Sequence, residues 1–199
     1  MTFREYAYLV WSDLYRIFGR LQWKTLVWCI LFGEAFQYIF WLRTCAYTKS
    51  HPLLKCTAYP FAYLMLRRLR YIFGISIPID TPIGSGFYIG HFGGIVVHNR
   101  CVIGKNCNLS HGVTLGQANR GPRKGWPVIG DNVYIGPGAK IIGRVAIGNN
   151  VAIGANCVVT KDIPDNAVVV GIPGKVISFE GSYGYVNRTD YENKLKRGP

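Results

Sequence analysis

From Ile83 onward, aliphatic residues recur every six positions. The longest unbroken series runs through Ile129, Ile135, Ile141, Ile147, Ile153 and Val159, and shorter ones run through Ile83 and Ile89 and through Val97, Ile103, Leu109 and Leu115. A glycine often follows the aliphatic residue, and a small or β-branched residue stands four positions after it. This period predicts a parallel β-helix in which each short strand stacks on its equivalent three repeats later, with the aliphatic residues filling the interior.

The repeat also places three of the six cysteines. Cys101, Cys107 and Cys157 occupy the small position. We expect buried, unpaired thiols there, because free cysteine packs as a compact apolar residue and an apolar site raises its pKa. No C-x-x-C pair is present and nothing at the N-terminus resembles a cleavable signal peptide, so we expect a reducing, cytoplasmic location.

The first 74 residues follow a different period. Hydrophobic side chains three, four and seven positions apart, the spacing of one helix face, occur at Trp11, Leu14, Tyr15 and Phe18. Gly33 interrupts the helical pattern, and a further helical stretch covers residues 53–73. We therefore predict an α+β protein with a helical N-terminal subdomain (1–74), a β-helix domain with an extruded loop (75–178) and a C-terminal tail (179–199).

The helical subdomain contains many aromatic residues. Residues 25–42 are almost uncharged, but Glu34 lies at their centre, and a carboxylate at mid-depth is costly in a membrane span. The last helical stretch carries Arg67, Arg68 and Arg70. One interpretation is a helical cap that packs on protein. The alternative is an aromatic, cationic surface in peripheral contact with the inner face of an anionic membrane.

Composition argues against a disordered chain, and the absence of known motifs argues against a nucleic-acid-binding protein. The 199-residue chain has 23 Lys and Arg against 10 Asp and Glu, a net charge of +13, yet 49% of its residues are hydrophobic and only 17% are charged. This balance excludes general disorder. The positive charge permits nucleic-acid binding, but no helix-turn-helix, RNP or zinc-finger motif is present, so we predict no nucleic-acid partner.

The six-residue period breaks in two places. Val97 stands eight positions after Ile89, so the coil must bulge within His91-Phe92-Gly93-Gly94. Ile129 stands fourteen positions after Leu115, so a loop is extruded between them. Because the register is kept elsewhere, these two interruptions are where we expect a functional site.

Several motifs across the coil carry a family resemblance. They are I-G-H-F-G-G-I-V-V-H (89–98), V-T-L-G (113–116), I-G-P-G-A-K-I-I-G (135–143), I-G-A-N-C-V-V-T-K-D-I-P (153–164) and G-I-P-G-K-V-I (171–177). With them, the stretch from Ile83 to Ser178 resembles the left-handed β-helix, hexapeptide-repeat acyltransferases, particularly the serine O-acetyltransferase branch. The N-terminal helices look more like the polysaccharide-biosynthesis members of that branch.

The resemblance implies a homotrimer that binds acetyl-CoA, the acyl donor, between adjacent coils and transfers its acetyl group directly to a hydroxyl. His91 matches the family's catalytic histidine, and an imidazole suits a general base near neutral pH. Asp80 is the only acidic residue between Glu34 and Asp131, and is therefore the candidate that orients the imidazole. Its offset from His91 is shorter than the family's spacing, and a simple turn aspartate is the alternative.

The extruded loop departs from the family pattern. Serine acetyltransferases have an Arg-His pair before the loop's proline, where this chain has Gly125-Trp126. Trp126 could face a sugar ring or only anchor the loop, and Arg123 could still hold a carboxylate. His111 could hydrogen-bond the acceptor or simply be solvated.

The predicted cofactor contacts are small residues and lysines. Small side chains that let the backbone approach the pantetheine arm are offered by Gly116, Gly136, Ala139, Gly154 and Ala155, while Lys161 and Lys175 match positions that meet CoA phosphates in the family. The alternatives are turn geometry for the glycines and solvated side chains for the lysines.

These observations predict an acetyl-CoA-dependent O-acetyltransferase that acts on a hydroxyl of a sugar or glycan intermediate, with no metal. The alternative is a serine O-acetyltransferase of cysteine biosynthesis. A zinc-dependent, carbonic anhydrase-like β-helix would use His91, His98 and His111 as ligands, but these lie close together in sequence. A purely structural β-helix leaves the bulge and the loop unexplained.

Overall fold

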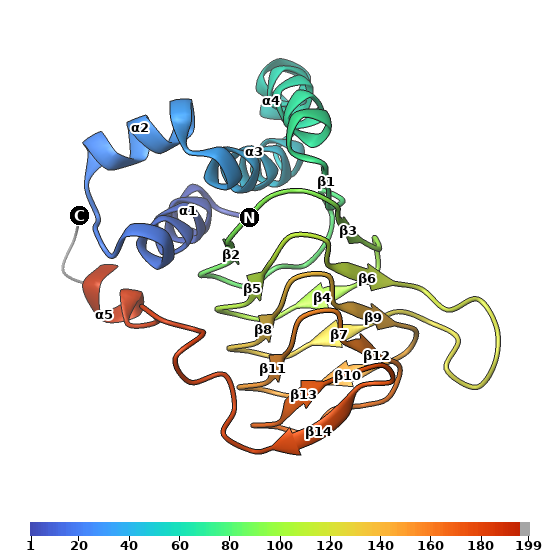
Figure 1. Cartoon of the computed structure of the whole chain (residues 1–199). Coiled ribbons are helices and arrows are strands. Elements are labelled where there is room, and N and C mark those ends of the chain that lie inside the picture. The colour runs from blue at the N-terminus through green and yellow to red at the C-terminus, as the bar shows by residue number, and fades with distance from the viewer. Residues whose placement is uncertain (196–199) are drawn as a thin grey trace.

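The computed structural model describes residues 1–195, which form a helical region followed by a coil of short strands. The helices are α1 (Phe3–Phe18), α2 (Trp23–Phe32), α3 (Glu34–Lys49), α4 (Pro52–Phe73) and, near the C-terminus, α5 (Tyr191–Leu195). Figure 1 shows α1 to α4 gathered over the end of the coil at which the strands begin.

The strands form the three faces of a parallel β-helix. The first sheet contains β1 (Ile75–Ser76), β3 (Ile95–Val97), β6 (Thr114–Gly116), β9 (Lys140–Ile142) and β12 (Val158–Val159). The second contains β4 (Val102–Ile103), β7 (Val128–Ile129) and β10 (Ala146–Ile147). The third contains β2 (Tyr88–Ile89), β5 (Asn108–Leu109), β8 (Tyr134–Ile135), β11 (Ala152–Ile153), β13 (Val168–Val170) and β14 (Lys175–Ser178). Only β14 is antiparallel to its neighbour, and it closes the last turn of the coil.

The strand register confirms the repeat. Ala152 pairs with Tyr134, and Val158 pairs with Lys140, so equivalent strands lie three six-residue repeats apart. The repeating aliphatic positions line the interior from Ile89 to Val159. Because each turn buries its aliphatic side chains against the next turn, the core is continuous along the coil axis.

The three cysteines of the repeat lie in this core, as predicted. Cys101, Cys107 and Cys157 are free and fully buried. Burial raises the pKa of the Cys101 thiol to about 11 and that of Cys107 to about 12. These thiols are therefore packing residues and stay protonated at neutral pH.

The helical region, residues 1–74, contains four helices, and Gly33, the interruption expected from the sequence, separates the second from the third. Helix α2 ends at Gly33, whose amide donates to the carbonyl of Cys29, and α3 begins at the next residue. In residues 1–195 no single helix is long and apolar enough to cross a membrane; α2 and α3 pass that test only as a pair bent by 99°.

A buried ion pair attaches the helices to the coil. Arg43 of α3 contacts Asp13 of α1 at 2.9 Å, and both side chains are almost completely buried. The backbone amide of Phe87 donates to Asp13 at 2.7 Å, and Arg43 donates to the carbonyl of Gly84 at 2.6 Å. Since each charge has several partners, the pair positions both helices on the first turn of the coil.

The three corners of the coil differ in residue type. The glycine corner joins the third sheet to the first and carries Gly94, Gly112 and Gly138 at φ values of +66°, +70° and +73°, followed by Asn156 at +54° in the last turn. The loop corner joins the first sheet to the second and carries the extruded loop, residues 117–127, which projects sideways in Figure 1. The asparagine corner joins the second sheet to the third and carries Asn106, Asn132, Asn150 and Asn166, also at positive φ.

The C-terminal segment covers the asparagine corner. Ser182 donates its amide to the carbonyl of Asn150 at 2.9 Å, and Tyr185 stacks on Tyr134 with ring centroids 4.5 Å apart. Tyr191 of α5 is buried beside α1. Most of the predicted tail therefore packs on the protein; its last residues, 196–199, lie outside the described residues.

Candidate active site

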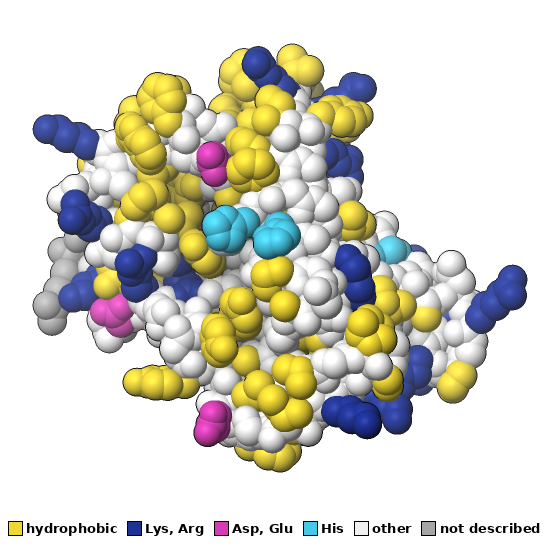
Figure 2. Space-filling model, in the orientation of Figure 1, with side chains coloured by type: hydrophobic (Ala, Val, Ile, Leu, Met, Phe, Trp, Pro, Cys, Tyr) yellow, Lys and Arg dark blue, Asp and Glu magenta, His cyan; other side chains and the backbone are white. Residues whose placement is uncertain are grey.

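The two histidines nearest the bulge lie together on the glycine corner. The ring centroids of His91 and His111 are 6.1 Å apart, with the rings tilted by 72°. Both side chains are exposed, and Figure 2 shows a pair of neighbouring histidines on the face drawn. The two extra residues of the bulge let His91 stand on one turn directly beside His111 on the next.

Backbone hydrogen bonds fix the two histidine turns to each other. The amide of Gly112 donates to the carbonyl of Gly93 at 2.7 Å, and the amide of Gly138 donates to the carbonyl of His111 at 2.9 Å. Three successive turns are therefore held in register. The histidines stand on rigid backbone, as a catalytic pair requires.

In the two turns that carry the histidines, and in the turn after them, the left-handed position of the corner is a glycine. A Cβ atom built on Gly94 would lie 3.4 Å from the Cα of Gly112, and one built on Gly112 would lie 3.3 Å from the Cα of Gly138. The left-handed backbone requires glycine or asparagine here, and glycine keeps the surface bare. An extended ligand can therefore lie against the backbone beside His91 and His111.

Lys140 is a further residue of this region that the sequence analysis did not single out. Its ammonium group donates to the carbonyl of Gly112 and, at 3.1 Å, to Thr114 Oγ1. Gly112 directly follows His111, so this bond supports the turn that carries the second histidine. Lys140 belongs to the motif of residues 135–143. Its contact could not be predicted from the sequence, because the carbonyl oxygen that a lysine on a strand reaches depends on how the neighbouring turn packs.

Asp80, the predicted orienting acid, is engaged elsewhere. Both of its carboxylate oxygens accept hydrogen bonds from the Lys49 ammonium group, at 2.7 and 2.6 Å. Its side chain is 72% exposed. Within residues 1–195, Asp80 makes no hydrogen bond to His91, so its orienting role stays a prediction that would require release from Lys49.

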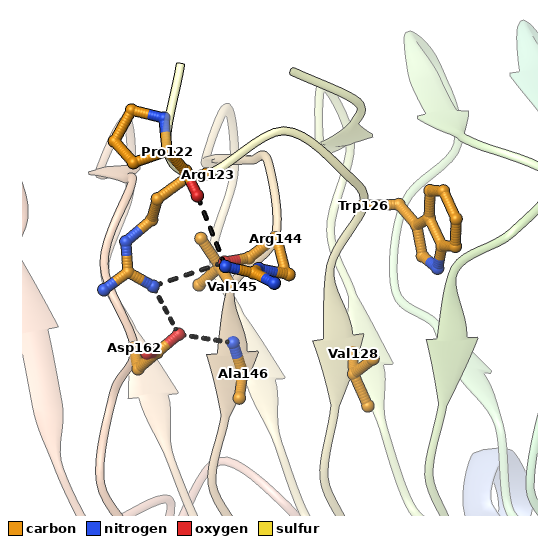
Figure 3. A pocket seen from close by; sticks show the side chains of 8 residues that line it. All are labelled: Pro122, Arg123, Trp126, Val128, Arg144, Val145, Ala146 and Asp162. Atoms are coloured by element: carbon orange, nitrogen blue, oxygen red, sulfur yellow. Dashed lines mark hydrogen bonds and ion pairs between the residues drawn. The ribbon is translucent and has the colours of Figure 1, made fainter. Parts of the chain in front are cut away.

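Side-chain hydrogen bonds hold the extruded loop against its own coil, and we call the pair formed by Arg123 and Asp162 the clasp. The loop lies at one edge of the first sheet, and the histidines lie at the other. Arg123 donates to Asp162 at 2.8 Å and to the carbonyl of Arg144 at 3.2 Å, and hydrogen bonds from this guanidinium lower the pKa of the Asp162 carboxyl. Figure 3 shows these bonds beside a cavity of about 570 Å³. The Arg123 guanidinium is thus engaged within the chain, so its expected role of binding the carboxylate of an acceptor stays a prediction that would require release from Asp162.

Trp126 is held by two neighbours at the base of the loop. Its ring stacks on His98 with an interplanar angle of 17°, and the Arg100 guanidinium lies 4.9 Å from the ring centroid. The ring is half-buried and packs against the main core. These contacts favour the anchoring interpretation of Trp126 over a free platform for a sugar ring.

The predicted cofactor residues fall into separate groups. Gly136, Gly154 and the exposed Ala155 continue down the glycine corner below the histidines. Ala139 is fully buried, and its amide and carbonyl are hydrogen-bonded to Gly136 and Thr114, so the residue is a core position and offers a ligand no exposed surface. The residues away from this corner are Gly116 and Lys161 at the loop corner and Lys175 in β14.

His98 does not join the other two histidines. It lies at the loop corner against Trp126, whereas His91 and His111 lie at the glycine corner. Among residues 1–195, no three His, Cys, Asp or Glu side chains are close enough to share a metal ion. One copy of the chain therefore does not assemble the three-histidine zinc site considered from the sequence.

A parallel coil with a six-residue period, widened at a histidine bulge and an extruded loop and shortened by two residues between Val159 and Ile163, is typical of a hexapeptide-repeat transferase. The family of bacterial hexapeptide transferases (six repeats) accordingly matches residues 127–161.

Curated and solved relatives identify the branch. The chain is 41% identical over 132 residues to the serine acetyltransferase of Staphylococcus epidermidis, a match that covers 66% of this chain and 62% of the relative. The CoA complex of Brucella abortus serine acetyltransferase is similar at 30% identity, with a TM-score of 0.72 and coverage of 88% and 69% of the two chains. The serine complex of the Neisseria gonorrhoeae enzyme is similar at 31%, with a TM-score of 0.70 and coverage of 88% and 70%.

The chain therefore belongs to the serine acetyltransferase family. It spans only about three fifths of the curated relative's length, 62%. The comparisons favour the serine acetyltransferase alternative of the sequence analysis over its sugar-directed main interpretation, and they give no support to the polysaccharide-biosynthesis branch.

Proposed function

We propose that this protein transfers the acetyl group of acetyl-CoA to the hydroxyl of L-serine. The observation that carries the proposal is the histidine pair, His91 and His111, on the open glycine corner of a hexapeptide-repeat coil. The relatives support both substrates, because serine acetyltransferases of the same fold have been solved with CoA and with serine.

In this proposal His91 is the general base. Its imidazole takes the hydroxyl proton while the hydroxyl oxygen bonds to the thioester carbonyl carbon. The carbon–sulfur bond then breaks, and the imidazolium returns the proton to the departing thiolate, so the products are the O-acetyl ester and free CoA thiol. Positioned base catalysis of this kind contributes about 10²- to 10⁴-fold in rate. His111, on the adjacent turn, hydrogen-bonds the acceptor.

The donor lies along the glycine corner. Its pantetheine arm runs along the corner past Ala155, which is small and exposed. Gly136 and Gly154 serve the corner indirectly, because their missing side chains let the next turn of the coil pack closely against them. Lys161 and Lys175 are exposed cations suited to the CoA phosphates. Both lie away from the glycine corner of their own copy, so in this proposal they meet a donor bound between two copies, and the net charge of +13 attracts such a polyanion.

The active unit is a homotrimer of coils with the left-handed sense that the family resemblance implies. Within one copy, the histidines and the extruded loop occupy opposite edges of the first sheet. The loop of one copy therefore reaches the histidine pair only if a second copy packs beside it. Three-fold packing of identical coils supplies one such site at each of three interfaces.

Mixing two inactive variants tests this shared site. His91→Ala removes the base, and replacing residues 119–124 by Gly-Gly removes the loop. If the site lies between copies, co-expression of the two variants should restore activity at about one site in four, because random mixing pairs an intact histidine with an intact loop that often. No recovery, or a loop variant that is active alone, would contradict a shared site.

Steady-state assays identify the acceptor. Acetyl-CoA consumption should be faster with L-serine than with any of a panel of sugars, nucleotide sugars and amino sugars. D-serine and L-alanine are matched controls, since the first changes the stereochemistry and the second lacks the hydroxyl. If a sugar is turned over faster than L-serine, the acceptor is a carbohydrate and not serine, and the proposed acyl-transfer chemistry still holds.

A carbohydrate hydroxyl is the second candidate acceptor. The observation that favours it is Gly125-Trp126, where the resemblance implies an Arg-His pair in serine acetyltransferases. Arg123 would have to be released from Asp162 to replace that clamp. If Trp126 binds a sugar, Trp126→Ala should reduce turnover of a sugar acceptor specifically. If Trp126 only anchors the loop, the same substitution should reduce turnover of all acceptors alike.

We also propose that the enzyme works in the reducing environment of the cytoplasm. All six cysteines are free, and five of them are buried. An unpaired exposed thiol, Cys56, is more compatible with a reducing than with an oxidising compartment.

A further inference from the structure

Helix α2 leaves most of its large apolar side chains uncovered. Only Leu26 and Cys29 of its ten residues are buried. Trp23, Trp28 and Phe32 are 65%, 54% and 65% exposed. The helix has no acidic residue. A helix that packs only on its own protein turns such side chains inward, so this face points to a further contact.

Helix α4 extends this apolar face on the other side of α3. Its exposed Phe61, Leu64 and Ile72 share one side of the helix, with Arg68 between them at helical spacing. Figure 2 shows hydrophobic side chains over both helices, with Lys and Arg side chains around them. We define the α2–α4 surface as the exposed side chains of Trp23, Val27, Trp28, Leu31 and Phe32 together with Phe61, Leu64 and Ile72.

The charges around this surface are almost all positive. Residues 1–74 contain 10 Lys and Arg and 3 Asp and Glu, and one of the acids, Asp13, is neutralised in the buried pair with Arg43. No acidic residue occurs between Glu34 and Asp80. Exposed cations that belong to α2 and α4 are Lys24, Lys55, Arg67, Arg68 and Arg70.

We propose that the α2–α4 surface binds an anionic membrane. Aromatic and leucine side chains on a basic helix insert among lipid headgroups, while lysine and arginine reach the phosphates. A second copy of the chain would bring two positively charged faces together, which charge repulsion opposes. The apolar side chains of α3 are largely buried in the protein, so the helices lie on the membrane and do not cross it.

Vesicle binding by the unmodified protein is the first test. The protein should sediment with vesicles of phosphatidylglycerol and phosphatidylcholine in equal amounts, and about tenfold more weakly with phosphatidylcholine alone. Salt should weaken the anionic binding, because surface charges are screened. Neither acetyl-CoA nor an acceptor is present, so this result is independent of the proposed enzymatic activity.

Paired variants locate the contact. Trp28→Ser with Leu31→Ser should weaken vesicle binding about tenfold or more, because both side chains lose apolar contact with lipid. Arg67→Glu with Arg68→Glu should remove the preference for anionic vesicles. Ile177→Ser with Phe179→Ser is the matched control, since these apolar side chains are equally exposed, at 63% and 65%, at the far end of the coil. Circular dichroism confirms that each variant folds.

Three results would overturn the proposal. The first is no binding of the unmodified protein to anionic vesicles. The second is equal loss of binding in the control pair. The third is a lower molar mass of the Trp28→Ser/Leu31→Ser variant in lipid-free light scattering, which would identify the surface as a contact between copies.

Discussion

The glycine corner and the asparagine corner solve the same backbone problem with different residues. Each turn of the coil needs a left-handed residue at both corners. At the asparagine corner, the side chains of Asn106, Asn132, Asn150 and Asn166 form a hydrogen-bonded ladder along the axis. At the glycine corner, the equivalent positions beside His91 and His111 are Gly94 and Gly112, which carry no side chain, and an asparagine, Asn156, appears only in the last turn.

The difference separates stability from ligand access. Asparagine tolerates a left-handed φ and adds a side chain that bonds to the next turn, so that corner is reinforced and then covered by the C-terminal segment. Glycine satisfies the same φ and adds nothing, so its corner gains no bonds and keeps its backbone accessible. Placing an asparagine at the glycine corner should therefore lower activity, and placing a glycine at the asparagine corner should lower stability.

Removing the base at the glycine corner should have the largest effect. His91→Ala should lower kcat about 10²- to 10⁴-fold, because the acceptor hydroxyl loses its proton acceptor, while the calorimetric Kd for CoA changes by no more than about twofold. His51→Ala is the control, since His51 lies in the helical region, where it contacts the backbone of Met1 and the ring of Tyr47. A His91→Ala enzyme that keeps about a tenth or more of wild-type kcat would disprove the assignment.

Introducing the asparagine of one corner into the other should have the next largest effect. Gly94→Asn should lower kcat/KM about 10- to 100-fold, because the new side chain occupies the surface beside the histidines and displaces the reactants. Its free energy of unfolding should hardly change: φ is +66° and the added Cβ meets its nearest atom at an ordinary 3.4 Å. Unaltered kinetics in a folded variant would show that substrates do not approach this corner.

The reverse exchange should act on stability alone. Asn132→Gly keeps the left-handed backbone but removes the bonds to Asn106, at 2.8 Å, and to Asn150, at 3.0 Å. We expect a loss of about 1–2 kcal/mol in the free energy of unfolding, measured by urea denaturation. The values of kcat and KM at a temperature where the variant is folded should match wild type. A kinetic defect there would mean that the two corners are coupled.

The repeat made the coil predictable because its period is local and redundant. Every six-residue unit from Ile129 to Val159 independently requires one inward aliphatic residue, so the strand positions and the buried Cys101, Cys107 and Cys157 followed from the sequence. The interruption at His91 was visible for the same reason: a two-residue excess stands out against a strict register.

The partners of charged side chains were not predictable, because they join residues distant in sequence. Arg123 pairs with Asp162, and Asp80 pairs with Lys49 on α3. Charge alone does not show which cation an exposed carboxylate meets, since such pairs are weak and their geometry depends on the packing of other elements. For Arg123 and Asp80, the sequence therefore indicated roles without showing that each side chain pairs within its own chain, with Asp162 and with Lys49.

The third corner offers the smallest predicted effect. The Arg123–Asp162 clasp holds the loop, and Arg123 lowers the pKa of the Asp162 carboxyl below its ordinary value of 3.8. A lowered folded-state pKa means that the stabilisation is fully present above about pH 4 and is lost as the pH falls through the lowered value.

At neutral pH, Asp162→Asn should therefore speed tryptic cleavage of the loop about two- to fivefold, because an exposed ion pair contributes little. Asp165→Asn, which alters a carboxylate at the asparagine corner, should leave loop cleavage unchanged. Equal cleavage of the Asp162→Asn variant and wild type would show that the backbone bonds between Ala118 and Gly125 hold the loop without the clasp.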